Sequence, residues 1–400
     1  MVNYSTAKPQ LRYQLLFEGT WPTAVAFVGS GRKLAAANQL GQIFLWDLPA
    51  APPAFTPRAG QERRAPDVPP QRRLDGHTNE ITHLEYTPIG QRLVSASLDR
   101  TVRLWPLDAA TTGKAEVILD GETRRREARR TGKKEPPPAP GHGVAVQTQC
   151  RVLEGHRDWI HALGLSADGK HAISGDAAAG VIVWDLSKEP PAPRAKWSGH
   201  PWNWIVAASL TADGQTALVS EYRYKRDDFD IPTPALKLWE VPSATEKLDL
   251  LKVQFPKIQP QQRSYGAAQV WRRFVANGLI TTAIAPDGKL VAVGQGGETE
   301  TGKVHLLDAT TGKLVRSVSG HLNGVTDVLF SPDGKYVISA GRDTSARICQ
   351  VSDGKEVAVL GTPRGGQFKD WFSAVALSPD GRSLAAADIA GLIHVWEFVG

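Results

Sequence analysis

The chain has 400 residues, of which 41% are hydrophobic and 22% are charged, and its formal net charge is +6. With only two cysteines, Cys150 and Cys349, it is expected to form neither a disulfide framework nor a thiolate metal site. No apolar run is long enough to span a membrane, and the N-terminus lacks the apolar stretch of a signal peptide, so we expect a soluble cytoplasmic protein.

The chain begins with residues 1–10, which we expect to be a frayed tail. Residues 11–17 (LRYQLLF) predict a strand, and residues 21–47 form a first, degenerate repeat unit with Ala36 and Leu40 at two of its marker positions. Residues 48–72 are rich in Pro, Ala and Arg. Such a composition buries too little apolar surface to order itself, so this segment predicts a disordered or loop insert.

Residues 73–105 are the most complete repeat unit. A Gly-His pair ending at His77 is followed by three predicted strands, of which the last closes on Trp105. Asp99 lies 22 residues after His77, and Ser95 lies four residues before Asp99. Two later units repeat parts of this spacing. His156, Ser174 and Trp184 keep it with Ala178 in the Asp place, and His321, Ser339 and Asp343 keep it with Cys349 in the Trp place.

Longer segments interrupt the repeats. A second insert, about 107–148, is basic and rich in Pro, and we expect it to be disordered or a loop. Residues 247–253 predict a strand, and two long connections, 221–235 and 254–277, precede and follow it. The final unit ends at Trp396 with no fourth strand of its own.

Gly-His pairs recur at 76–77, 155–156, 199–200 and 320–321, and strands ending in LWD, VWD, LWE and VWE surround Trp46, Trp184, Trp239 and Trp396. With turn signals at 168, 213, 287, 333 and 380, these features repeat with a period of about 40 residues. In these features the chain resembles the WD40-repeat β-propeller family. The resemblance implies an all-β, seven-bladed propeller spanning residues 11–400, with a four-stranded antiparallel sheet in each blade. It also implies that the N-terminal strand completes the last blade and closes the ring.

His77, Ser95, Asp99 and Trp105 contain the side chains of a catalytic triad, and two interpretations follow. In the family such residues form a buried hydrogen-bonded network, each bond contributing on the order of 1 kcal/mol. A nucleophile would instead be unique and placed at a cleft. Because partial copies recur at 156–184 and 321–349, we favour the structural network. We expect no enzyme, no catalytic residue, no cofactor and no metal site.

One position suggests a binding surface. Aligned on the turns, it holds Trp21, Glu80, Trp159, Trp204, Gly278, Gly324 and Trp371. By the resemblance, this position lies at the rim of the central opening on the face called the top. Each Trp could simply pack under its own loop, but four together favour a shared binding rim. Interface-prone residues in the two long connections extend it: Tyr222, Arg223, Tyr224 and Trp271.

The sequence therefore predicts a monomeric, non-catalytic scaffold that binds a protein or peptide through its top face. The alternative is nucleic-acid binding through two basic runs, 58–73 with net charge +3 (five Arg, two acidic residues) and 121–135 with +4 (seven Lys or Arg, three acidic residues). These runs lack interleaved aromatics for base stacking, so solvated linkers explain them better.

Overall fold

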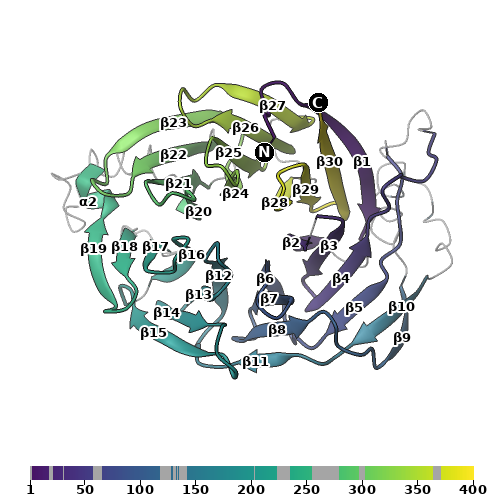
Figure 1. The fold of residues 1–400 in the computed structure, drawn as a ribbon, viewed down its shortest axis with the longest axis horizontal. Helices are drawn as coiled ribbons and strands as arrows, with labels where there is room; N and C mark the ends of the chain where they lie inside the picture. Colours follow the sequence, from purple (N-terminus) through teal and green to yellow (C-terminus); the bar gives the residue numbers. More distant parts are fainter. Residues whose placement is uncertain are drawn as a thin grey trace.

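The computed structural model describes residues 2–17, 21–29, 31–56, 65–117, 142–201, 203–222, 235–254, 279–296, 302–363 and 371–400, with three isolated residues between 117 and 142. Its strands form seven antiparallel blades in a ring around a central opening (Figure 1). The prediction of a seven-bladed β-propeller is confirmed. Six sheets have four strands, and the sheet of the first blade has six.

Blades are numbered here in chain order, and the strands of each run from the centre outward. Blade 1 contains β2 (Pro22–Val28), β3 (Lys33–Asn38), β4 (Gln42–Asp47) and β5 (Arg72–Asp75); blade 2 contains β6 (Ile81–Thr87), β7 (Arg92–Ser97), β8 (Val102–Pro106) and β11 (Arg151–Leu153). Blade 3 contains β12 (Ile160–Leu165), β13 (His171–Asp176), β14 (Gly180–Asp185) and β15 (Ala192–Ser198); blade 4 contains β16 (Trp204–Leu210), β17 (Thr216–Tyr222), β18 (Ala235–Glu240) and β19 (Thr245–Asp249). Blade 5 contains β20 (Leu279–Ile284), β21 (Leu290–Gln295), β22 (Gly302–Asp308) and β23 (Leu314–His321); blade 6 contains β24 (Val325–Phe330), β25 (Tyr336–Gly341), β26 (Ser345–Gln350) and β27 (Glu356–Gly361). Blade 7 contains β28 (Phe372–Leu377), β29 (Ser383–Asp388), β30 (Leu392–Val399) and, outermost, β1 (Lys8–Leu16).

The core lies between neighbouring blades, and the second strands show why this sequence suits it. Both faces of these strands are covered, so they are apolar along nearly their whole length. In β3 and β29 the runs Ala35–Ala37 and Ala385–Ala387 are completely buried. Their small side chains leave room for larger partners from the third strands, such as Phe44 and Trp46 in one of these clusters.

The N-terminal strand closes the ring, as predicted. β1 pairs antiparallel with β30, from Lys8 opposite Val399 to Leu16 opposite Leu392, so blade 7 joins the two ends of the chain (Figure 1). We expected a frayed tail over residues 1–10, but the described residues of this segment are packed on the propeller. Tyr4 is 2% exposed, and its hydroxyl donates a 2.6 Å hydrogen bond to the carbonyl of Gly381. Its ring packs edge-on against Tyr336 and Phe398, which provides the apolar contact that orders the tail.

The two inserts are partly ordered, which corrects the expectation of disorder for their described residues. From the second insert, β9 (Gly113–Val117) and β10 (His142–Gln147) form a hairpin that joins blade 1, with β10 parallel to β5. Arg72 anchors this hairpin by donating to the carbonyl of Leu107 and to Gln147 Oε1. From the first insert, Ala65 and Val68 are buried. Residues 57–64 of the first insert, and residues 118–141 of the second apart from three isolated residues, lie outside the described residues.

In blade 4 the predicted strand 247–253 is also wrong in part. The outer strand β19 stops at Asp249, and a short helix, α2 (Leu250–Gln254), follows. Asp249 Oδ1 accepts hydrogen bonds from the backbone N–H of Leu251 and Lys252, so it caps the helix and ends the strand. Leu250 and Leu251 are buried against blades 4 and 5. The connection that follows α2 lies outside the described residues.

Every innermost strand carries a β-bulge near its start, which the repeat pattern did not reveal; it follows the first residue in six blades and the second residue of β16 in blade 4. The register shifts lie at Pro22/Ala24, Ile81/His83, Ile160/Ala162, Ile205/Ala207, Leu279/Thr281, Val325/Asp327 and Phe372/Ala374. In four blades the bulged residue is Thr or Ser. Its hydroxyl donates to the first carbonyl of the next blade, as Thr82 does to Ile160 at 2.9 Å. A bulge re-aims one side chain, here toward the neighbouring blade.

Candidate interaction face

A buried polar chain supports the turn at the top of blade 2. The Trp105 indole N–H donates to Ser95 Oγ at 2.9 Å, and Ser95 Oγ lies 2.7 Å from His77 Nε2. The other imidazole nitrogen of His77, Nδ1, lies 2.8 Å from Asp99 Oδ2. The carboxylate of Asp99 also accepts from Thr78 and Thr101, so the chain connects the third strand to the loop before the first.

Blades 3 and 6 contain the same chain with one change each. In blade 6, His321 lies 2.9 Å from Asp343 Oδ1 and 2.8 Å from Ser339 Oγ, with Cys349 where an indole would donate. In blade 3, Ser174 and Trp184 take their expected places. The carboxylate that partners His156 comes from Asp176, at 2.8 Å, two residues before the expected position of Ala178.

Hydrogen bonding fixes the charge of these carboxylates. Burial alone would raise the pKa of Asp99, but the hydrogen bonds from His77, Thr101 and backbone N–H groups outweigh it and hold the pKa well below its usual range. For the same reasons the pKa of Asp343 falls to about 2. The Ser95 side chain is 0% exposed and shares its hydroxyl between an indole and an imidazole. A hydroxyl that is buried and already shared in this way favours the structural interpretation over the catalytic one.

The predicted rim residues lie at or just before the start of the innermost strands. We call this side of the propeller the top face. It carries the loops before each first strand and the loops between each second and third strand. Trp21 and Trp159 are 41% and 47% exposed. Trp204 is half-buried because its ring stacks on His161, with centroids 5.1 Å apart and planes 9° apart. Trp159 meets the same imidazole edge-on. Blades 3 and 4 thus present two indoles joined by a histidine.

The remaining rim residues are less exposed, and Trp371 and Glu80 contact side chains of neighbouring blades. Trp371 is half-buried under Arg342, whose guanidinium lies 4.3 Å from the ring centroid. Glu80 is half-buried and accepts a hydrogen bond from Gln39, and burial raises its pKa. Tyr222, also half-buried, ends β17 beside the central opening. Three predicted residues, Arg223, Tyr224 and Trp271, lie outside the described residues.

Exposed apolar side chains distinguish the two faces. Among the described residues, eight large hydrophobic side chains are strongly exposed: Trp21, Leu40, Val152, Trp159, Leu314, Val315, Leu322 and Val359. Four of them, Trp21, Leu40, Trp159 and Leu322, lie in top-face loops, and the other four lie on outermost strands at the perimeter. Within the described part of the chain, the loops of the opposite face contribute none. Among the described residues, the loops with exposed large apolar side chains are therefore those of the top face.

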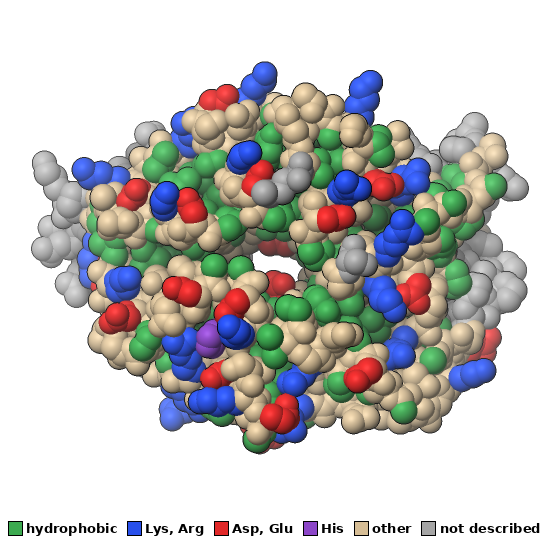
Figure 2. All heavy atoms as spheres, in the orientation of Figure 1, with side chains coloured by type: hydrophobic (Ala, Val, Ile, Leu, Met, Phe, Trp, Pro, Cys, Tyr) green, Lys and Arg blue, Asp and Glu red, His purple; other side chains and the backbone are tan. Residues whose placement is uncertain are grey.

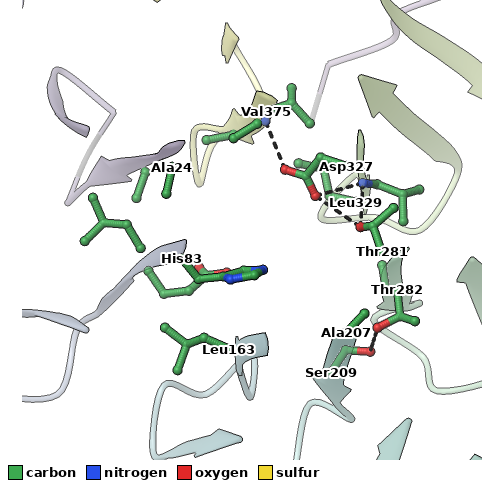
Figure 3. A pocket seen from close by; sticks show the side chains of 18 of the residues that line it. Ala24, His83, Leu163, Ala207, Ser209, Thr281, Thr282, Asp327, Leu329 and Val375 are labelled. Carbon is green, nitrogen blue, oxygen red and sulfur yellow. Dashed lines mark hydrogen bonds between the residues drawn. The ribbon is translucent and has the colours of Figure 1, made fainter. Parts of the chain in front are cut away.

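A channel of about 960 Å³ passes between the innermost strands of the ring. Figure 2 shows its opening, with acidic side chains visible inside. Figure 3 shows His83 of blade 2 pointing into the channel and Asp327 of blade 6 across from it. Glu85 also lines this space, as do Trp204, Tyr222 and Arg342 near the top face. Neither Glu85 nor Asp327 was predicted as a site residue, although each is a charged residue inside an innermost strand.

Other kinds of site find no support in the described part of the chain. It holds no group of three or more His, Cys, Asp or Glu side chains that could bind a metal ion. It also holds no helix long and apolar enough to cross a membrane.

Comparison with known proteins identifies the repeats. Residues 69–106, 147–185 and 312–349 match the family model of the WD domain, G-beta repeat. Each match covers the fourth strand of one blade (β5, β11 or β23) and the three inner strands of the next blade. These are the three repeats that contain the His–Ser–Asp chains.

Similar proteins carry longer sequences. The chain is 35% identical to autophagy-related protein 16 of Arabidopsis thaliana over 252 residues, which cover 62% of this chain and 41% of that protein. It is 25% identical to human striatin-4 over 360 residues, 82% of this chain and 43% of the relative. With the nuclear distribution protein nudF of Aspergillus niger it shares 23% identity over 302 residues, 70% of this chain and 61% of the relative. The chain thus spans less than two thirds of each.

Proposed function

Because the chain folds as a seven-bladed β-propeller and three of its segments match the WD domain, G-beta repeat, we propose that it is a cytoplasmic, non-catalytic scaffold of the WD40-repeat type that binds a protein or peptide segment on its top face. The observation that carries the proposal is the exposure of Trp159 beside the stacked pair His161 and Trp204. Indole rings that are exposed before binding supply interface energy while contributing little to folding.

Rigidity supports the same proposal. The rim indoles start innermost strands, which the bulge hydroxyls and the closed ring hold in place. A surface that is ordered before binding loses little conformational entropy when the partner arrives. Trp21 and Trp371 begin the adjacent blades 1 and 7, so they extend the proposed surface around the opening from a second side.

The alternative of nucleic-acid binding through the basic runs gains no support. In the first run, Arg72 is used in the hairpin anchor and Arg73 pairs with Asp75 at 2.7 Å. The other three arginines of that run and nearly all of the second run lie outside the described residues. Protein binding on the top face is the function we retain.

Affinity capture with the full chain tests the proposal, comparing wild type with Trp159→Ala. Val315→Ala is the matched control, because Val315 is equally exposed, at 48%, but lies on the perimeter. We expect Trp159→Ala to weaken binding of the captured partner about tenfold or more while the unfolding midpoint stays near that of wild type. The proposal fails if Trp159→Ala binds like wild type, or if Val315→Ala is the variant that loses binding.

A further inference from the structure

The channel wall carries acidic groups that lack a counter-ion among the described residues. Glu85 on β6 has neither a hydrogen bond nor an ion pair with them, although the ring encloses it and only the channel gives water access to it. Asp327 lies on β24, where its carboxylate accepts from the backbone N–H groups of Val328 and Val375. Enclosed carboxylates are ordinarily paired with a cation.

Burial acts on both carboxylates in the same direction. It raises the pKa of Glu85 to about 7 and that of Asp327 to about 6, and the charge of Asp327 adds to the effect at Glu85. Within the part of the chain that the structure describes, the channel lining has no Lys, and its one Arg, Arg342, is held over Trp371. The interior is therefore acidic and uncompensated.

The third channel group is an imidazole that also lacks a partner. His83 is enclosed, points into the channel (Figure 3), and its Nδ1 has no hydrogen-bond partner among the described residues. Burial, with the charge of His161 as a smaller cause, lowers its pKa to about 4, so the ring is neutral near pH 7. A neutral imidazole has an acceptor nitrogen. The site thus offers acceptors from two strands on opposite walls.

We propose that the channel receives a guanidinium group, carried by an arginine side chain of the segment bound on the top face. A guanidinium presents five N–H donors in a plane and no acceptor, which suits an acceptor-rich acidic site. Trp204 and Tyr222 line the end of the channel near the top face, where aromatic rings favour an entering cation. The inference rests on the proposed top-face function, because that face supplies the peptide.

A small probe tests the channel without the partner. Nα-acetyl-arginine methylamide is titrated into the full chain at pH 7.5, and the imidazole Cε1–H signal of His83 is followed by NMR, assigned with His83→Gln. The neutral isostere Nα-acetyl-citrulline methylamide and magnesium chloride at equal ionic strength are the comparison ligands. We expect the arginine derivative alone to shift the signal.

Two variants locate the effect. Glu85→Gln should weaken the response to the arginine derivative about tenfold or more, because it removes a carboxylate that makes no contact needed for folding. Glu116→Gln, which removes the same charge from the exposed outer strand β9, should respond like wild type. The inference is overturned if citrulline or magnesium shifts the signal equally, or if Glu85→Gln responds like wild type. Such a failure leaves the top-face proposal standing, since that proposal depends on Trp159 and partner capture.

Discussion

At the scale of single residues, the indoles of the third strands show what the buried polar chain contributes. Trp105 and Trp46 occupy equivalent places, and both are almost completely buried. The Trp105 N–H donates to Ser95, whereas the Trp46 N–H is buried without a partner among the described residues because Ala36 stands in the serine place. Of these two indoles, only Trp105 has a hydrogen bond to lose.

We therefore expect Trp105→Phe to lower the free energy of unfolding by about 1 kcal/mol more than Trp46→Phe. Both changes remove a similar volume, so the cavity cost largely cancels between them. Urea unfolding of the two variants measures the difference. Equal losses would show that the Ser95 hydrogen bond contributes nothing.

Asp99→Ala should lower the free energy of unfolding by roughly 1–3 kcal/mol, because it leaves His77 and the backbone N–H of Thr78 without their acceptor. Partner affinity, measured where both proteins are folded, should stay nearly unchanged. A loss of some activity with an unchanged unfolding midpoint would instead support a catalytic role for the triad residues.

The channel carboxylate Glu85 gives a pH-dependent prediction. Its folded pKa of about 7 lies above the ordinary 4.5, so folding favours the protonated form and its ionisation costs stability as pH rises through this window. Glu85→Gln should therefore gain stability relative to wild type between about pH 4.5 and 7 and keep that gain above it. Chemical unfolding of both proteins at matched pH gives the difference, and a difference independent of pH would contradict the assignment.

Residue spacing alone could predict most of the His–Ser–Asp chains of blades 2, 3 and 6. It failed in blade 3, where the carboxylate belongs to a residue outside the expected position. Asp99 and Asp343 stand at the same distance from their histidines. Asp176 ends its strand and caps the following turn through the N–H groups of Ala178 and Gly180, and from there its other oxygen reaches His156. The sequence reveals this arrangement only if an Asp at the end of the second strand is also considered as a partner of the histidine.

At the scale of elements, the bulged first strands link neighbouring blades. The hydroxyl of Thr82 donates to the carbonyl of Ile160 across the blade 2–blade 3 junction and also lies within hydrogen-bond distance of Ala96. Thr82→Val should lower the free energy of unfolding by about 1 kcal/mol, since the shape is kept and the donor is lost. Thr82→Ser retains the donor and should stay closer to wild type. Equal stability of the Val and Ser variants would contradict this role.

The strands of each blade and their order can be predicted from alternating apolar patterns and turn residues. Extra strands that join a blade from an insert cannot be predicted in this way. The hairpin β9–β10 attaches to blade 1 although the chain enters it from blade 2. Its pairing with β5 depends on backbone groups and on the Arg72 anchor, neither of which follows from composition. The same limit applies to the tail, because its composition does not reveal that Tyr4 is buried against the last blades.

At the scale of the whole molecule, ring closure fixes two faces of different character. The first strands run from the top face, and the top-face loops carry the exposed Trp21, Leu40, Trp159 and Leu322. The repeat pattern is enough to place these loops together on one side of the ring. Their exposure, and the acidic channel between them, depend on side-chain packing, which the repeat pattern does not specify.

Site-specific photo-crosslinking of the captured partner tests the central claim most directly. A benzophenone side chain is placed at Leu40, which is 58% exposed on the top face, or at Lys289, whose side chain is 80% exposed on the opposite face. The account predicts that the partner crosslinks to position 40 and not to position 289, and that adding Trp159→Ala removes the product. A partner that crosslinks at position 289 and not at position 40 would contradict it.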